Sequence, residues 1–225
     1  MSLQEKLSAF KTQFQSGKPP FEGVPASVHG VMQRAIDELV ASGASQRVRR
    51  SGVAPAFELM SADGTRVRLA DLTAKGAVVV SFYRGVWCPY CNLDLRELES
   101  YADRIRSTGA SLVAITPQTA ANSRKLIDDH NVSFPVLRDP GNSVADQYGL
   151  RYRLPDYLIE LYKQLGVDLS AFNADGSWTL PVPARFIIDR DGNIRYAEAN
   201  PDYTRRPEPE ELLPVLRSLA SAVAA

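Results

Sequence analysis

The continuous apolar and β-branched run from Ala77 to Tyr83 constrains the fold of this chain more than any other segment. A strand without apolar–polar alternation is buried on both faces, so helices or a second sheet must cover each face. A similar run spans Ser111 to Thr116, and apolar residues at helical spacing follow the two runs over Pro89 to Arg106 and Ala120 to His130. This order predicts parallel strands that are connected by helices.

Several shorter segments extend this sheet and cover it. Asp63-Gly64 and Asp191-Gly192 are hairpin signals between short strand patterns. Further strands are expected at 57–60, 66–69, 134–137, 185–189 and 193–197, and further helices at 143–148 and 208–222. The sequence therefore predicts an α/β fold with a central mixed sheet that is flanked by helices on both faces.

Two segments lie outside this pattern. Apolar residues at helical spacing predict helices over 3–14 and 26–42, followed by a connector at 44–54. A stretch of about residues 151–178 interrupts the strand–helix order and contains one more expected helix, at 158–165. We therefore predict an N-terminal helical extension at 1–50 and one main domain at 51–225 with this insertion. The extension can pack on its own domain or on a second subunit, so a homodimer is one expectation.

Composition argues against several classes of protein. The 225 residues contain 26 Lys and Arg against 26 Asp and Glu, and the basic run Arg47-Val48-Arg49-Arg50 is short, so no nucleic-acid partner is expected. No window reaches the roughly 18 apolar residues of a membrane span, and Met1 to Phe14 does not read as a signal peptide. We expect a cytoplasmic protein without membrane contact. In that compartment cysteines are catalytic, metal-binding or inert rather than structural disulfides.

Cys88 and Cys91 are the two cysteines of the chain, and they lie where the first buried strand gives way to a helix. The unpaired N–H groups and the dipole at a helix N-terminus stabilise a thiolate, which can lower a cysteine pKa from about 8.5 to about 3.5–7.5. Pro89 suits the first helical position because it lacks an N–H, and Trp87 adds an apolar wall. The spacing therefore predicts a catalytic dithiol.

Two other interpretations of the cysteine pair are weaker. A structural zinc site needs about four ligands, and neither His29 nor His130 has ligand spacing to the pair. Neither a metal nor another cofactor is therefore expected. Two buried, inert cysteines are the second alternative. Their joint position at one strand-to-helix junction argues against it.

The segment Ser81-Phe82-Tyr83-Arg84-Gly85-Val86-Trp87-Cys88-Pro89-Tyr90-Cys91 resembles the active-site segment of AhpC/TSA peroxiredoxin-like proteins that carry a thioredoxin-type Cys-x-x-Cys pair. The resemblance covers roughly residues 53–225. Other segments that share it are Pro55 to Leu59, Ile115 to Gln118, Phe134 to Asp139 and Phe186 to Asp189. It implies a thioredoxin-like fold and thiol-dependent redox chemistry.

The chain departs from the usual motif of that family at the dithiol. Ordinary peroxiredoxins carry Pro-x-x-x-Thr-x-x-Cys. When the two segments are aligned, Arg84 stands at the proline, Cys88 at the threonine and Cys91 at the peroxidatic cysteine. The alignment therefore slightly favours Cys91 as the peroxide-reactive thiol and Cys88 as its resolving partner. The thioredoxin analogy favours the opposite assignment.

A second departure concerns the distant arginine of the peroxiredoxin motif. Pro183 stands at its position, where thioredoxin-like reductases carry a cis-proline beside the dithiol. The resemblance implies a cis Val182–Pro183 bond that leaves the Val182 backbone free to pair with a substrate, the alternative being a trans proline on an edge strand. Alternate residues of a strand share a face, so Arg185 can supply the missing cation, the alternative being a solvated strand position. Arg84 is the other candidate cation near the dithiol.

The resemblance implies that the protein reduces hydroperoxides through a Cys88/Cys91 dithiol–disulfide cycle, with electrons from a thioredoxin-like or glutathione-type donor. A thiol–disulfide reductase is the alternative, in which Cys88 attacks a protein or small-molecule disulfide. A non-catalytic redox-sensing module is a hypothesis from a different class. Turnover separates the classes, because a sensor reacts once and stops.

Overall fold

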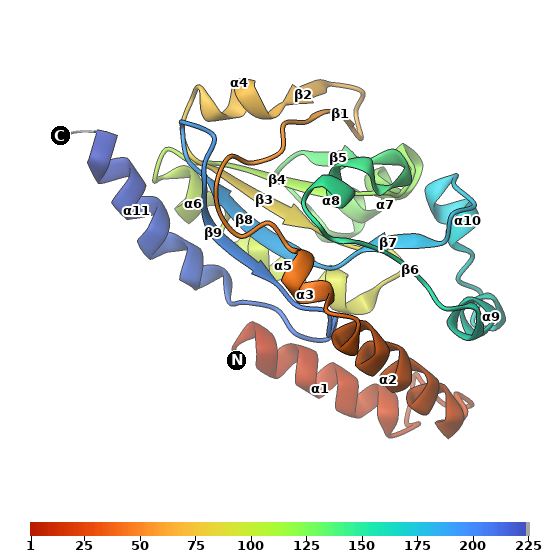
Figure 1. Ribbon diagram of the computed structural model, residues 1–225. Helices are drawn as coiled ribbons and strands as arrows, with labels where there is room; N and C mark the ends of the chain where they lie inside the picture. The colour runs from red at the N-terminus through yellow and green to blue at the C-terminus, as the bar shows by residue number, and fades with distance from the viewer. Residues whose placement is uncertain (224–225) are drawn as a thin grey trace.

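A seven-stranded mixed sheet forms the centre of the computed structural model, which describes residues 1–223 (Figure 1). Its strand order is β2-β1-β5-β4-β3-β8-β9. β3, β4 and β5 are parallel, and the outer strands pair antiparallel. The strands are β1 (Glu58–Ser61), β2 (Arg66–Arg68), β3 (Val78–Phe82), β4 (Ser111–Thr116), β5 (Val136–Arg138), β8 (Ala184–Ile188) and β9 (Ile194–Ala199). The predicted thioredoxin-like α/β fold is confirmed.

Both faces of the sheet are buried, as the apolar run in β3 requires. Every residue of β3 is buried, and successive side chains face different cores. Val79 belongs to one core, whereas Val78 and Val80 belong to the other. Helices α5, α6, α7 and α11 pack in the first core, and α3, α4 and α8 pack in the second.

The helices of the main domain follow the sequence pattern with two exceptions. The helix expected over 89–106 is divided in two at Tyr101, and the short helix at Leu69–Thr73, where the pattern predicted the end of a strand, was not expected. The helices are α4 (Leu69–Thr73), α5 (Pro89–Ser100), α6 (Ala102–Arg106), α7 (Ala120–His130), α8 (Ser143–Gln147) and α11 (Leu212–Val223), with 3-10 turns at Pro140–Asn142 and Pro209–Glu211. Within residues 1–223 no helix combines the length and apolar character needed to cross a membrane.

The N-terminal helix α1 (Leu3–Gln15) packs on the main domain. Leu3 and Leu7 are fully buried in the core that contains α5. The N–H groups of Leu3 and Gln4 donate to the Glu208 carboxylate over 2.9 and 3.0 Å. A carboxylate at this place stabilises the helix because it satisfies two unpaired N–H groups and opposes the positive end of the dipole. Of the two packing arrangements expected for this helix, the chain shows packing on its own domain.

The insertion packs against the second N-terminal helix, α2 (Ala26–Ala41). It contains β6 (Arg151–Arg153), α9 (Asp156–Gln164) and α10 (Leu169–Asn173), and it leads into β7 (Thr179–Pro181), which pairs with β6. Val28, Leu158 and Trp178 lie in a third core, which contains residues of both α2 and α9. The expected connector at 44–54 instead begins with a short helix, α3 (Ala44–Arg47), because Ala44 is buried against the domain.

The predicted cis Val182–Pro183 bond is wrong. The cis bond among the described residues is Pro19–Pro20, and Val182–Pro183 is trans. The Val182 N–H donates to the Leu150 carbonyl oxygen over 2.8 Å, so the backbone that was expected to be free is already paired. This bond lies where the β6–β7 pair leads into β8, and an extended chain path there requires no cis bond.

Candidate active site

The two cysteines lie at the N-terminus of α5, as the sequence predicted. Cys88 is the N-cap residue, Pro89 is the first helical residue, and Cys91 lies one turn into the helix. Both are free thiols, and their exposed fractions are only 1% and 0%. The backbone therefore directs the positive end of the helix dipole at Cys88, while the protein excludes bulk water from both sulfurs.

The two thiols have opposite protonation tendencies. Burial opposes a Cys88 thiolate, but a hydrogen bond from the Cys91 thiol and the charges of Arg84 and Arg206 outweigh it and lower the pKa of Cys88 to about 6. Burial and the neighbouring Cys88 sulfur raise the pKa of Cys91 well above its ordinary value. These directions favour Cys88 as the thiolate of the pair and Cys91 as the thiol that donates to it.

Arg84 lies beside Cys88 in an aromatic cage of Trp87, Tyr162 and Tyr203. Its guanidinium carbon is 4.8 Å from the centre of the Trp87 ring and 4.0 Å from that of Tyr203, and it donates a hydrogen bond to the Tyr162 hydroxyl. Arg84 is 1% exposed, and among residues 1–223 no carboxylate lies within ion-pair distance of it. A buried cation is costly without a counter-charge, so the Cys88 thiolate is the anion that balances it.

A second buried cation reaches Cys91. Arg206 donates to Cys91 Sγ over 3.5 Å and pairs with Asp94 Oδ2 over 3.2 Å. Asp94 also forms an ion pair with Arg185, which in addition donates to the Pro207 carbonyl oxygen over 2.9 Å. Arg185 is thus neither solvated nor directed at the sulfurs. It holds Asp94, and through Asp94 it positions Arg206. The cation that contacts a sulfur is therefore Arg206, where the sequence had suggested Arg185.

The loop before Cys88 is held by two amides. Gln118 is fully buried, and its Oε1 accepts the Val86 N–H over 2.8 Å. Asn92 Nδ2 donates to the Val86 carbonyl oxygen over 2.8 Å. Gly85 has φ +153°, and a Cβ there would lie 2.5 Å from Trp87 Nε1. The close approach of Trp87 to the backbone therefore requires glycine at position 85.

Gly85→Ala is expected to destabilise the fold by about 1–3 kcal/mol, because the added methyl group must displace Trp87 or strain the backbone. Chemical denaturation measures this effect. Gly176→Ala is the matched control, because its Cβ would meet no heavy atom within 4 Å. Equal free energies of unfolding for the two variants would show that the loop adapts freely.

An apolar cavity of about 320 Å³, which we call the aromatic cavity, opens onto Cys88. Its size lies within the range of about 300–1,000 Å³ that is typical of small-molecule sites. Helices α1, α2 and α9 and the loops beside them cover it, with Phe10, Met32 and Tyr162 among the lining residues. Cys88 lines this cavity, whereas Cys91 is not among the residues that line it.

Sequence reasoning found part of this site. It brought Arg84, Trp87, Cys88, Pro89 and Cys91 together. It did not place Asp94 of α5 at the site, nor four residues from distant segments, namely Gln118, Tyr162, Tyr203 and Arg206. Asp94 lies one turn after Cys91 on α5, so helical spacing alone could have placed it beside the dithiol.

Val182 contributes to the opposite core from the two cysteines, so this part of the expected thioredoxin-type site is not formed. Among the residues that the structure describes, no group of three or more His, Cys, Asp and Glu side chains is placed to hold a metal ion.

A thioredoxin-like fold with a dithiol at the start of the helix after its central strand defines a thiol-dependent oxidoreductase. The AhpC/TSA family model matches residues 51–197, which is more than half of the chain. The protein belongs to the AhpC/TSA family.

The relatives of this chain include proteins named as peroxiredoxins and proteins named as thiol-disulfide oxidoreductases. The chloroplastic peroxiredoxin Q of Oryza sativa subsp. japonica is 25% identical over 177 residues, which cover 77% of this chain and 69% of the relative. The thiol-disulfide oxidoreductase ResA of Halalkalibacterium halodurans is 28% identical over 96 residues, which cover 42% of this chain and 53% of the relative.

Solved structures share the fold at low sequence identity. The peroxidoxin BcpB of Mycobacterium tuberculosis has a TM-score of 0.59 at 20% identity, over 79% of this chain and 99% of that chain. A mutant of peroxiredoxin 6 from Arenicola marina has a TM-score of 0.62 at 18% identity, over 78% of this chain and 75% of that chain.

Proposed function

We propose that this protein reduces organic hydroperoxides, with Cys88 as the peroxide-reactive thiolate and Cys91 as its resolving thiol. The observation that carries the proposal is the position of Cys88, the sulfur with the lowered pKa, at the wall of an apolar cavity beside the buried Arg84. This assignment is the reverse of the one that the motif alignment favoured.

The proposed reaction has two steps in the protein. The Cys88 thiolate attacks the terminal oxygen of the hydroperoxide, so that the O–O bond breaks, an S–O bond forms, and the alkoxide takes a proton from water to leave as an alcohol. The Arg84 guanidinium stabilises the negative charge that develops on the departing oxygen. The Cys91 thiol then attacks the Cys88 sulfenic acid, which forms the disulfide and releases water. A thioredoxin-like or glutathione-type donor returns two electrons.

The alternative, a thiol–disulfide reductase, is favoured by the Cys-x-x-Cys spacing at a helix start. Two observations weigh against protein disulfides as its substrates. Cys88 is 1% exposed, and the Val182 N–H that would pair with an extended peptide is bonded to Leu150. Small disulfides that fit the cavity are the form of this alternative that the geometry supports.

Steady-state turnover of cumene hydroperoxide with a thioredoxin-type reducing system tests the proposal. We expect sustained turnover, and little reduction of a protein disulfide such as that of insulin under the same conditions. The reverse preference would establish the thiol–disulfide reductase instead. A single stoichiometric oxidation without turnover would indicate a redox-sensing module.

A further inference from the structure

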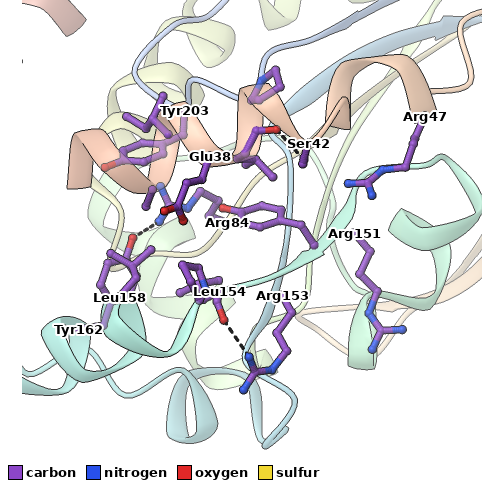
Figure 2. Close-up of a pocket in the computed structure, with 16 residues that line it drawn as sticks. Glu38, Ser42, Arg47, Arg84, Arg151, Arg153, Leu154, Leu158, Tyr162 and Tyr203 are labelled. Atoms are coloured by element: carbon purple, nitrogen blue, oxygen red, sulfur yellow. Dashed lines mark hydrogen bonds between the residues drawn. The ribbon is translucent and has the colours of Figure 1, made fainter. Parts of the chain in front are cut away.

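A second cavity, of about 460 Å³, lies on the other side of the aromatic cage, and four arginines line it. We call it the arginine pocket and define its cations as Arg47 from α3, Arg84, and Arg151 and Arg153 from β6. Figure 2 shows Arg84, Tyr162 and Tyr203 on one side of this pocket and Arg47 and Arg151 on the other. Glu38 from α2 is the one carboxylate among the lining residues.

The charges of this pocket are unbalanced. Glu38 already pairs with Arg34 over 2.7 Å and accepts the Tyr157 hydroxyl over 2.5 Å, and Arg153 pairs with Asp156 over 2.8 Å. Within residues 1–223, Arg47 and Arg151 have no carboxylate within 4.0 Å, whereas the charge of Arg84 is balanced by the Cys88 thiolate. Arg47 is exposed, Arg151 half-buried and Arg84 buried. The pocket is therefore complementary to an anion.

One buried atom points independently to a ligand. Arg84 is 1% exposed, and its Nε is buried without a hydrogen-bond partner. A buried donor left without a partner costs about 1–3 kcal/mol, so it is a good position for a ligand oxygen. The same side chain lines both cavities, together with Tyr162 and Tyr203.

The two cavities differ in chemistry, and Arg84, Tyr162 and Tyr203 line both of them. On the Cys88 side the lining includes Phe10, Phe14, Phe21, Met32, Leu165 and Val167, all of them apolar. On the other side lie the arginines. A ligand that extends past the three shared residues would place an apolar part against the aromatic residues and an anionic part against the guanidinium groups.

We propose that the substrate is an organic hydroperoxide that carries a carboxylate, and that the arginine pocket binds this carboxylate through Arg47 and Arg151. The proposal deepens the proposed function and rests on it. The carboxylate takes no part in the redox step: the O–O bond is cleaved by Cys88 as described above, and the products are the hydroxy acid and water. Its role is to lower KM and to orient the peroxide toward Cys88.

Kinetics with 13-hydroperoxyoctadecadienoic acid and with its methyl ester test the proposal. The ester keeps the peroxide and the apolar chain and lacks only the charge. We expect kcat/KM for the acid to exceed that for the ester at least about tenfold in the wild type, mainly through KM, because charge-assisted hydrogen bonds to a carboxylate would be lost in the ester. This ratio should fall close to one in the Arg47→Gln/Arg151→Gln variant. Arg217→Gln, which removes an exposed arginine from α11, is the matched control and should keep the ratio.

Binding provides a readout that needs no turnover. Calorimetry with the Cys88→Ser variant should show that linoleate binds at least about tenfold more tightly than methyl linoleate, and that the double arginine substitution removes this difference. Equal kinetics for acid and ester in the wild type, with cumene hydroperoxide still reduced, would overturn this inference and leave the proposed function intact. Linoleate binding without reduction of any hydroperoxide would overturn the proposed function and, with it, this substrate assignment.

Discussion

Replacing Cys88 with serine is expected to lower kcat/KM for cumene hydroperoxide at least about a thousandfold, which corresponds to roughly 4 kcal/mol of transition-state stabilisation. Serine cannot supply a thiolate, and Cys91 cannot replace it, because its pKa is raised and it does not line the aromatic cavity. Stopped-flow mixing with the hydroperoxide, followed by mass detection of the sulfenic acid, measures this loss.

Cys91→Ser is the matched variant, and it should behave differently. Cys88 keeps the cation of Arg84 and its place at the start of α5, so the sulfenic acid should still form within about tenfold of the wild-type rate. The reaction should then stop after one turnover, because no resolving thiol remains. If Cys91→Ser abolishes sulfenic acid formation while Cys88→Ser retains it, the roles of the two thiols are the reverse of those proposed here.

Arg84→Gln is expected to lower hydroperoxide reduction at pH 7 by about a hundredfold. Two effects add. The pKa of Cys88, about 6 in the native protein, rises when this cation is removed, and the departing oxygen loses a charged donor. Cys88 reacts as the thiolate, so wild-type activity should decline as pH falls through about 6. In the variant the same decline should occur at a higher pH.

Ultraviolet absorbance of the thiolate, recorded against pH, checks the first effect apart from catalysis. Arg84→Lys is the conservative control, because it keeps a positive charge but lacks the planar fork that contacts the cage. It should recover most of the pKa shift and only part of the rate. An unchanged titration midpoint in Arg84→Gln would show that the helix N-terminus and Arg206 suffice to hold the thiolate. Thermal unfolding of each variant shows whether the aromatic cage remains folded.

The buried arginines also explain why the dithiol differs from both of its nearest patterns. The sequence offered two candidate cations near the dithiol, Arg84 and Arg185. In the folded chain Arg185 forms an ion pair with Asp94, and the cations near the sulfurs are Arg84 and Arg206. Strand register predicts the face of the sheet on which an arginine lies. It does not predict which carboxylate the guanidinium group pairs with.

Local chemistry alone was sufficient for much of this protein. Local patterns predicted the central sheet and the helices that cover it. These patterns are the continuous apolar run in β3, the helical spacing after Pro89 and the two Asp-Gly turns, and each depends on residues that are close together in the chain. Cys88 and Cys91 at a strand-to-helix junction likewise identified the dithiol, since the helix N-terminus that stabilises a thiolate is itself a local feature.

Only the tertiary structure indicates which of the two thiols is the thiolate and which residues cover the dithiol. Arg206 and Tyr162 lie 115 and 71 residues from Cys91 along the chain, and no pattern within one segment relates them to it. The trans Val182–Pro183 bond follows in the same way from pairing with the inserted β6 segment. Ion pairs, buried hydrogen bonds and cavity walls depend on which segments meet in space, and the packing of α1, α2 and α9 against the domain forms the walls of the aromatic cavity.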